Sequence, residues 1–375
     1  MVCSDTESKF IQTIVENISR TLLKCKPLFV GKHLVGVKPR AKDVESLLSM
    51  ELDEVRMVVI HGIPGIGKTT IAKAVYNRIA NHFDGSSFLE NVREISETND
   101  GIIKLQGQLL KEISRDENEK IHSTSEGINL IQNRLRSKNV LLVLDDVDTL
   151  ERIEKLFGDW NWFTSRSRVI ITTAVDPQLL APLGKVYTTY EVKELDKHEA
   201  LQLFEKHAFC GKKPDKAYLE LTKQVIQYAQ GLPLAVKIIA RDLCERTKHE
   251  WESKLDMYNK IPNKGIQEVL KVSYDSLEET EQDIFLDIAC FFKGWTKNFV
   301  VDILNACDLY PDSGILRLVN KCLITVNQHG ILLMHDLIQQ MGREVVRRES
   351  PHTLGERSRL WHHKDSLDVL IENKV

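Results

Sequence analysis

The sequence predicts an α/β domain built on a doubly wound parallel sheet, followed by a helical subdomain and a winged-helix subdomain. Three observations lead to this prediction. A glycine-rich loop, "HGIPGIGKTT", joins an apolar run to a helical pattern early in the chain. Apolar strand patterns then alternate with helical patterns as far as about residue 190, which is typical of a parallel sheet. Beyond that point helical patterns follow one another, and a single hairpin pattern appears near residue 330.

The order of these patterns divides the chain into five segments. We expect a lead-in helix and linker at 1–28, a P-loop nucleotide-binding domain at 29–190, a helical subdomain at 191–262, a winged-helix subdomain at 263–350 and a C-terminal linker at 351–375. The expected strands include 57–60, 86–92, 140–144 and 167–174. The expected helices are 8–23, 69–82, 197–209, 218–230, 234–246, 266–277, 278–292, 296–307 and 313–322, with a hairpin turn at 328–330.

Composition narrows the classes of protein that the chain can belong to. Its 375 residues suffice for two or three domains, and 42% apolar content supports packed cores. A net charge of −3 gives no reason to expect nucleic acid or a membrane as a partner. The seven cysteines are scattered and never form C-x-x-C, which argues for a reducing compartment. With no signal-peptide pattern and no apolar run of about 18 residues, we expect a cytoplasmic protein, with the nucleus as an alternative.

The loop carries the full pattern of a phosphate-binding motif. Gly62, Gly67, Lys68 and Thr69 occupy every fixed position of G-x-x-x-x-G-K-[ST]. Glycines allow backbone N–H groups to turn toward an anion, the lysine reaches the β- and γ-phosphates, and the threonine hydroxyl binds Mg²⁺. The helix that begins near Lys68 directs its positive end at the same phosphates. These features predict a nucleotide with bound Mg²⁺.

A second motif supplies the carboxylates that such a loop requires. Asp145 and Asp146 follow the apolar run Val140–Leu144, at the edge of the sheet where ligands bind. We assign Asp145 to Mg²⁺, together with Thr69, and Asp146 to polarising an attacking water. The run "RVIITT" ends in hydroxyls at the same edge. The guanine signature N-K-x-D is absent from the sequence, which favours ADP or ATP as the nucleotide.

Taken together, the motifs resemble those of the NB-ARC module of plant nucleotide-binding leucine-rich-repeat resistance proteins. They occur in the family's order: "GIPGIGKTT", "FDGSSFLENVREIS", "LLVLDDVD", "SRVIITTA", "GLPLA", "FLDIACFF" and "MHDLIQQMGREVV". Asp148 and "FLDIACFF" are similar to the subclass that carries a TIR domain. The resemblance implies TIR and leucine-rich-repeat domains as partners within a longer receptor. It also leaves room for a homo-oligomer in the ATP-bound form. We expect neither of those domains within this chain, and therefore no NAD-cleaving site.

The resemblance also implies roles for individual residues. Val35 and Gly36 would contact the adenine, Pro233 of "GLPLA" the base or ribose, and His335 of "MHD" the β-phosphate of ADP. Asp336 would hold His335 in place, although without the family a helix cap at Asp336 would be the commoner interpretation. The phosphates would be wrapped by the loop residues Gly65, Ile66, Gly67, Lys68, Thr69 and Thr70.

One position departs from the family pattern. The strand after the aspartates usually ends in "TTR", and here it ends in "TTA" with Ala174. Loss of an arginine near the γ-phosphate, and the short Asp146 side chain, predict slow or absent hydrolysis. The favoured function is therefore a conformational switch of immune signalling that is off with ADP and on with ATP. The alternatives are a slow P-loop ATPase and a nucleotide-gated DNA-binding regulator. The few cations on the winged-helix segment disfavour DNA.

Overall fold

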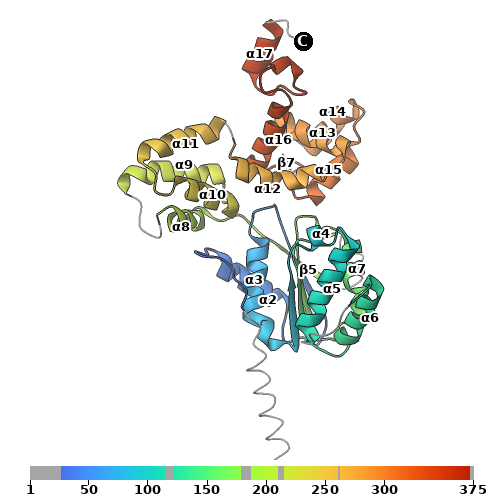
Figure 1. Ribbon diagram of the computed structural model, residues 1–375. Helices are drawn as coiled ribbons and strands as arrows, with labels where there is room; N and C mark the ends of the chain where they lie inside the picture. Colours follow the sequence, from blue (N-terminus) through green and yellow to red (C-terminus); the bar gives the residue numbers. More distant parts are fainter. Residues whose placement is uncertain (1–26, 115–120, 179–186, 210–214, 261, 372–375) are drawn as a thin grey trace, which may run out of the picture.

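The chain folds into three blocks in sequence order, which Figure 1 shows as a sheet-containing domain at the bottom, a helical subdomain at the left and a winged-helix block above. This computed structural model describes residues 27–114, 121–178, 187–209, 215–260 and 262–371. The helix predicted at 8–23 lies outside the described residues. The order of the blocks agrees with the predicted order of subdomains.

Within the described residues, five parallel strands form the sheet of the first block. Their order is β2-β3-β4-β1-β5, which confirms the predicted parallel sheet. The strands are β1 (Arg56–His61), β2 (Gly85–Leu89), β3 (Val140–Leu144), β4 (Arg168–Thr173) and β5 (Tyr187–Glu191). The sequence patterns did not identify β5 as a separate strand. Because β4 lies between β1 and β3, the loop after β1 and the aspartates after β3 approach each other across the end of β4.

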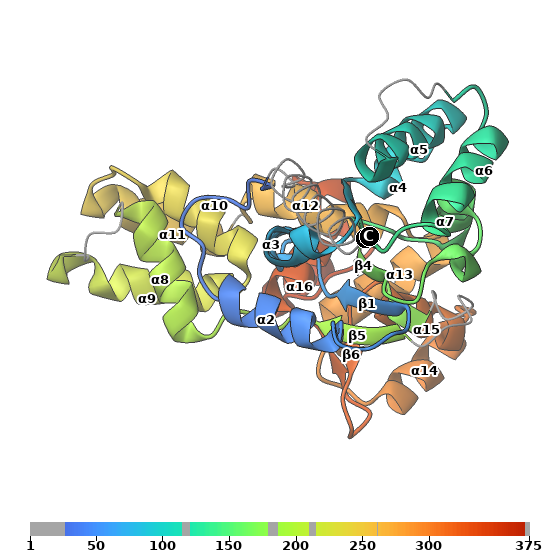
Figure 2. The ribbon, with the colours of Figure 1, turned by 90° about the horizontal axis from the view of Figure 1, so that it is seen from below.

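Helices cover both faces of the sheet. Val58 and Ile60 of β1 pack with α2 (Val37–Leu47) and α3 (Lys68–Ile79), whereas Met57 and Val59 pack with α5 (Asn99–Ser114), α6 (Thr124–Leu135) and α7 (Leu150–Phe157). This alternation follows from the two-residue period of a strand, and both faces are apolar because both are covered. Figure 2 shows α2 and α3 on the side of the helical subdomain and α5, α6 and α7 on the opposite side.

Within the described residues of the helical subdomain there are four α-helices. They are α8 (Lys197–Ala208), α9 (Leu219–Ala229), α10 (Pro233–Leu243) and α11 (Lys248–Lys260). A capping box between Asp196 and Glu199 starts α8. Pro233 is the first residue of α10, as predicted, because a proline there loses no intrahelical hydrogen bond. The start of α10 is therefore fixed by its sequence.

The third block combines helices with a short hairpin. Its elements are α12 (Lys264–Asp275), α13 (Glu279–Asp287), a π-helical turn η5 (Ile288–Phe292), α14 (Lys297–Asn305), α15 (Pro311–Asn320), β6 (Thr325–Val326), β7 (Leu332–Leu333), α16 (Asp336–Glu349) and α17 (His363–Ile371). The antiparallel β6–β7 pair surrounds the predicted turn. The single helix predicted at 278–292 instead changes to π geometry at Ile288, and such turns are frequent at functional sites.

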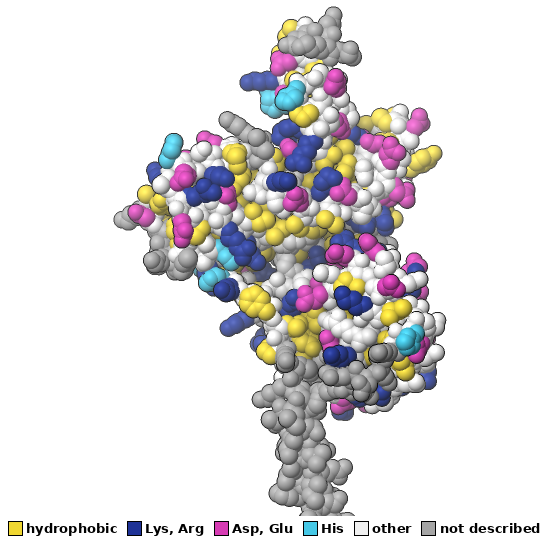
Figure 3. All heavy atoms as spheres, viewed as in Figure 1, with side chains coloured by type: hydrophobic (Ala, Val, Ile, Leu, Met, Phe, Trp, Pro, Cys, Tyr) yellow, Lys and Arg dark blue, Asp and Glu magenta, His cyan; other side chains and the backbone are white. Residues whose placement is uncertain are grey.

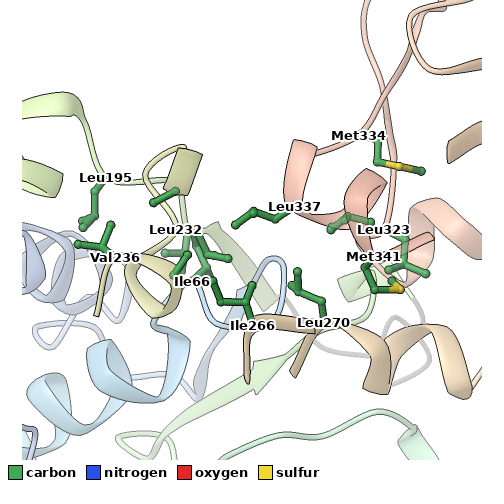
Figure 4. Close-up of a cluster of buried hydrophobic side chains, with 14 of the residues drawn as sticks. Ile66, Leu195, Leu232, Val236, Ile266, Leu270, Leu323, Met334, Leu337 and Met341 are labelled. Carbon is green, nitrogen blue, oxygen red and sulfur yellow. The ribbon is translucent and has the colours of Figure 1, made fainter. Parts of the chain in front are cut away.

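The three blocks share one buried apolar cluster where they meet (Figure 4). Ile66 comes from the loop after β1, Val236 from α10 and Leu270 from α12, while Leu337 and Met341 come from α16. The cluster joins residues that are far apart in the sequence, so the arrangement of the blocks is stabilised by apolar packing.

None of the described helices is both long enough and apolar enough to cross a bilayer.

Candidate functional site

The loop between β1 and α3 is closed on itself around Lys68. The Lys68 ammonium donates hydrogen bonds to the carbonyl oxygens of Gly62, at 2.8 Å, and Ile63, at 3.1 Å. Burial lowers the pKa of Lys68 to about 8. A buried ammonium is costly unless it is paired, so an anion that enters this loop would gain a strong interaction with Lys68.

Asp145 directly follows β3 and is 2% exposed. Thr69 donates a hydrogen bond of 2.8 Å to its Oδ1, and Thr172 donates one of 2.6 Å to the same oxygen. Burial raises the pKa of Asp145, although both hydroxyl groups oppose this shift. The predicted metal pair, Thr69 and Asp145, is thus in direct contact, and Thr172 of β4 bridges the gap between β3 and β1.

Asp146 has a strained backbone and an ion-paired side chain. Its φ angle is +59°, which is uncommon for a residue with a side chain. Its N–H donates to the Thr172 hydroxyl at 2.9 Å, and its carboxylate lies 3.0 Å from the Arg93 guanidinium. The Asp146 carboxylate, which we expected to polarise an attacking water, is thus ion-paired with Arg93.

These residues line a cavity of about 570 Å³, a volume typical of small-molecule sites. Its wall comes from residues 30–37 before α2, from the loop and start of α3, from the ends of β3 and β4, and from α8, α10 and α12. The structure brings together almost all the predicted site residues here: Val35, Gly36, Gly65, Ile66, Gly67, Lys68, Thr69, Thr70, Asp145, Asp146 and Pro233.

Gly36 is held against an ion pair that joins two blocks. Arg40 of α2 forms a two-pronged pair with Glu199 of α8, at 2.7 and 2.9 Å, and also donates to the Gly36 carbonyl. Gly36 has φ +69°, and a Cβ there would clash with both partners. The ion pair at the cavity wall therefore requires a glycine at this position. This requirement is different from the predicted contact of Gly36 with the adenine.

The "GLPL" segment contacts the phosphate loop directly. The N–H of Leu234 donates to the Gly65 carbonyl at 3.2 Å, and a Cβ on Gly65 would lie 2.9 Å from the Leu234 side chain. With φ +80° as well, Gly65 combines a left-handed backbone with this close approach. Pro233, the neighbour of Leu234, lines the cavity from the helical subdomain.

His335 lies apart from the cavity, and it is absent from the described residues that line it. Its Nδ1 accepts a 3.1 Å hydrogen bond from the Leu337 N–H, and its Nε2 lies 3.4 Å from the Gln230 carbonyl oxygen. His335 is thus the N-cap of α16, whereas Asp336, expected as the cap in the absence of a family, is its first helical residue. Asp336 contacts Lys293 and Gln230 instead.

The winged-helix block also contacts the edge of the sheet. The Asn320 carbonyl accepts a hydrogen bond from the Asp176 N–H, beyond the end of β4. Next to it, the thiol of Cys322 lies near Lys68 and the backbone of Gly62, and burial raises the pKa of this thiol to about 11. The third block therefore touches the phosphate loop through the segment that follows α15.

Two protein-family models match parts of this chain. Residues 40–214 match the NB-ARC domain, and residues 278–350 match the winged-helix domain of Roq1-like disease resistance proteins. The chain carries an NB-ARC domain and a Roq1-like winged-helix domain.

Curated relatives agree with this assignment. The chain is 46% identical over 369 residues to disease resistance protein RUN1 of Vitis rotundifolia, covering 98% of this chain and 27% of RUN1. It is 38% identical over 375 residues to TMV resistance protein N of Nicotiana glutinosa, covering 98% of this chain and 32% of that protein. The chain therefore spans roughly a quarter to a third of the length of these relatives.

Solved structures share the fold at low sequence identity. The Walker-type ATPase paby2304 of Pyrococcus abyssi has a TM-score of 0.57 and 14% identity, covering 86% of this chain and 99% of that chain. The ORC2 protein of Aeropyrum pernix has a TM-score of 0.51 and 11% identity, covering 86% and 97%. Both show that the NB-ARC chain has the fold of P-loop ATPases.

The NB-ARC cavity contains further polar residues that the motifs did not identify. Arg93 on α4 (Val92–Ile95) lines it beside Asp146, and His207 and Lys237 line it from the helical subdomain. On the face drawn in Figure 3, Lys, Arg and His side chains gather where this subdomain meets the first block. Arg93 belongs to the quoted "FDGSSFLENVREIS" motif, which could have identified it, whereas nothing in the sequence pattern indicated His207.

The donor set fits Mg²⁺ bound together with a nucleotide. The described residues contain no group of three or more His, Cys, Asp or Glu side chains that could hold a metal by themselves. Thr69 and the buried Asp145 supply one hydroxyl and one carboxylate, and Mg²⁺ typically uses one or two such ligands with phosphate oxygens and water. A divalent cation would also compensate the buried charge of Asp145.

Proposed function

We propose that this chain is the ADP/ATP-dependent conformational switch of an intracellular plant immune receptor, off with ADP and on with ATP. The observation that carries the proposal is the shared wall of the cavity. The first block, the helical subdomain and α12 of the winged-helix block all line it. A nucleotide bound there would therefore hold the three blocks together, and a change in its phosphates would alter contacts among them.

Each part of the cavity has a role in this proposal. Val35, Gly36 and Pro233 would contact the adenine and ribose, and the segment Gly65–Thr70 would wrap the phosphates. Mg²⁺ held by Thr69 and Asp145 would neutralise phosphate charge. His335 would reach the β-phosphate only after a shift from its present contact with Gln230. The homologous disease resistance proteins RUN1 and N support a role in immunity, and TIR and leucine-rich-repeat domains would be the receptor's other parts.

The first test is to purify the chain without added nucleotide, denature it, and identify what is released by chromatography. We expect ADP at close to one molecule per chain. Lys68→Ala should be purified without bound nucleotide, because the substitution removes the buried ammonium that binds the phosphates. The matched control is Lys42→Ala, which changes an exposed lysine on α2 and should retain ADP. Wild-type protein without nucleotide would contradict the proposal.

A P-loop enzyme with continuous turnover is the alternative, and it makes a different prediction. Such an enzyme would release phosphate steadily from ATP and Mg²⁺, and the release would disappear in Lys68→Ala. The uncharged Ala174 at the end of β4 and the short Asp146 side chain favour the switch, because both predict slow or absent hydrolysis. Continuous phosphate release by the wild-type chain would favour the enzyme instead.

A further inference from the structure

Arg93 is placed differently from the other cations that line the cavity. Lys32 belongs to the segment that leads into α2, and Arg40 lies on α2 itself and is already paired with Glu199. Lys237 comes from the helical subdomain, and Lys68 from the phosphate loop. Arg93 alone among the described lining cations comes from the segment after β2, and its guanidinium lies against Asp146.

The backbone around Arg93 is fixed to the segment of the two aspartates. The N–H of Val92 donates to the Asp145 carbonyl at 2.9 Å, and the N–H of Arg93 donates to the Asp146 carbonyl at 3.0 Å. The start of α4 is therefore tied to the metal-binding candidate Asp145 and to its neighbour Asp146. Its arginine is kept at the phosphate side of the cavity by main-chain bonds that do not depend on its own side chain.

The side chains, in contrast, are free to exchange partners. The Arg93 and Asp146 side chains are 31% and 30% exposed, so their 3.0 Å pair is open to solvent. Exposed ion pairs contribute little to stability, which makes their loss inexpensive. A terminal phosphate carries more charge than a carboxylate and accepts the planar guanidinium fork through two oxygens. It would therefore compete well with Asp146 for Arg93.

Nearby wall residues offer no substitute for this charge. Ala174 lines the cavity at the end of β4, and Asn91 lines it beside Arg93; neither side chain is ionic. Lys68 is the remaining cation that interacts with Asp145 and Asp146, and it belongs to the loop that wraps the phosphates common to ADP and ATP. Among the described wall residues, Arg40 is held by Glu199, so Arg93 carries the guanidinium that is placed to contact an added phosphate.

We propose that Arg93 is the residue that distinguishes a nucleoside triphosphate from a diphosphate in this cavity. With a diphosphate bound, its guanidinium stays on Asp146. With a triphosphate bound, the guanidinium moves to the terminal phosphate and leaves the Asp146 carboxylate free to accept a hydrogen bond from water. This inference rests on the proposed nucleotide switch and assigns its phosphate-reading residue.

The test compares the dissociation constants of ADP and of adenylyl imidodiphosphate, a non-hydrolysable triphosphate, in the presence of Mg²⁺. Arg93→Gln should weaken triphosphate binding about 10- to 100-fold, as expected for a charge-assisted hydrogen bond. ADP binding should change less than about threefold, because with a diphosphate bound the Arg93 guanidinium stays on Asp146 and does not contact the phosphates. Arg93→Lys keeps the charge but loses the planar guanidinium group. It should also weaken triphosphate binding more than ADP binding, but by a smaller factor than Arg93→Gln does.

Arg152→Gln is the matched control, because Arg152 pairs with Asp148 at 2.7 Å, is 23% exposed and does not belong to the described cavity wall. It should leave both constants unchanged. Equal weakening of the two nucleotides by Arg93→Gln or Arg93→Lys, or weakening of neither, would overturn the role of Arg93. Wild-type protein that binds neither nucleotide would instead refute the proposed switch itself, so the two failures are distinguishable.

Discussion

His207 is a polar residue of the cavity wall whose ring nitrogen is buried without a hydrogen bond. Its Nε2 finds no partner in the structure, and its ring packs edge-on against that of His33, with centroids 5.4 Å apart. Burial, reinforced by the charges of Lys237 and Arg241, lowers the pKa of His207 to about 4. The folded protein therefore holds this histidine neutral where an unfolded chain would begin to protonate it.

This shift predicts a pH dependence of stability. The unfolded chain takes up a proton at His207 near pH 6.5 and the folded chain only near pH 4, so stability should fall as the pH decreases between these values. His207→Asn should lose less melting temperature than the wild type between pH 7.5 and pH 5. His198→Asn, at an exposed position of the same helix, should behave as the wild type does. An unchanged pH dependence in His207→Asn would contradict this assignment.

The short sequence motifs predicted the cavity residues that lie within the motifs. They missed the residues that only the folding of the chain brings to the cavity. Lys68 and Asp145 were identified because their local sequences define a phosphate loop and a strand end. Arg93 stood in a recognised motif without an assigned role, and Ala174 was correctly noted as uncharged. His207 contacts His33, which is 174 positions away in the sequence, and no local pattern encodes such a contact.

Among the secondary-structure elements, β4 begins with a buried arginine where the sequence predicted an apolar strand. Arg168 is 1% exposed, and its guanidinium donates five hydrogen bonds to backbone carbonyls. The acceptors are Leu48, Ser49, Leu52, Glu54 and Ser167, at 2.7 to 3.0 Å. Arg168 thus satisfies the loop between α2 and β1 and ties it to β4, as a buried cation must to be tolerated.

Removal of this cation should therefore cost much more than removal of a neighbouring one. Arg168→Leu leaves several carbonyl oxygens without a donor, and we expect a loss of about 3 kcal/mol or more in unfolding free energy. Arg166→Leu is the matched control, because Arg166 is 69% exposed and pairs with an equally exposed Asp53. It should cost less than about 1 kcal/mol. An equal loss of unfolding free energy in the two variants, measured by urea unfolding, would show that Arg168 does not stabilise this loop.

Elements with strong periodicity were predicted well, and those shaped by tertiary contacts were not. The apolar run of β3 and the proline at the start of α10 specify their own structures. β5 was missed because "YTTYE" is a short, partly exposed edge strand that pairs with β1 alone. The π turn η5 was missed because its residues have an ordinary helical pattern, and in the structure it packs against α13 and α16.

Across the whole molecule, Asp336 links the winged-helix block to the helical subdomain. It contacts Lys293, which follows η5, and Gln230, which caps α9. Gln230 and Asp336 are separated by 106 positions, so neither the helix cap expected from the sequence alone nor the family resemblance predicted this contact. The three-block architecture itself was predictable from the order of motifs, whereas the contacts that close it were not.

Loss of this link should loosen the closed arrangement. Asp336→Val removes both contacts, and we expect ADP to be released about tenfold faster, in proportion to the loss of roughly one hydrogen bond. Release can be followed by displacement of a fluorescent ADP analogue. Asp312→Val should release ADP at the wild-type rate, because Asp312 forms only an exposed 3.9 Å pair with Lys297. Unchanged ADP retention in Asp336→Val would remove Asp336 from the closing contacts.

Because Cys322 contacts the phosphate loop, the reactivity of its thiol depends on the conformation of the chain. While the blocks are closed, this thiol is covered and ionises only at strongly alkaline pH, and a thiol that does not ionise is a poor nucleophile. If the winged-helix block moves away, Cys322 becomes an ordinary thiol with normal reactivity toward oxidants and electrophiles. If the proposed switch opens in this way, the same movement exposes a redox-sensitive group, so oxidants would modify open chains faster than closed ones.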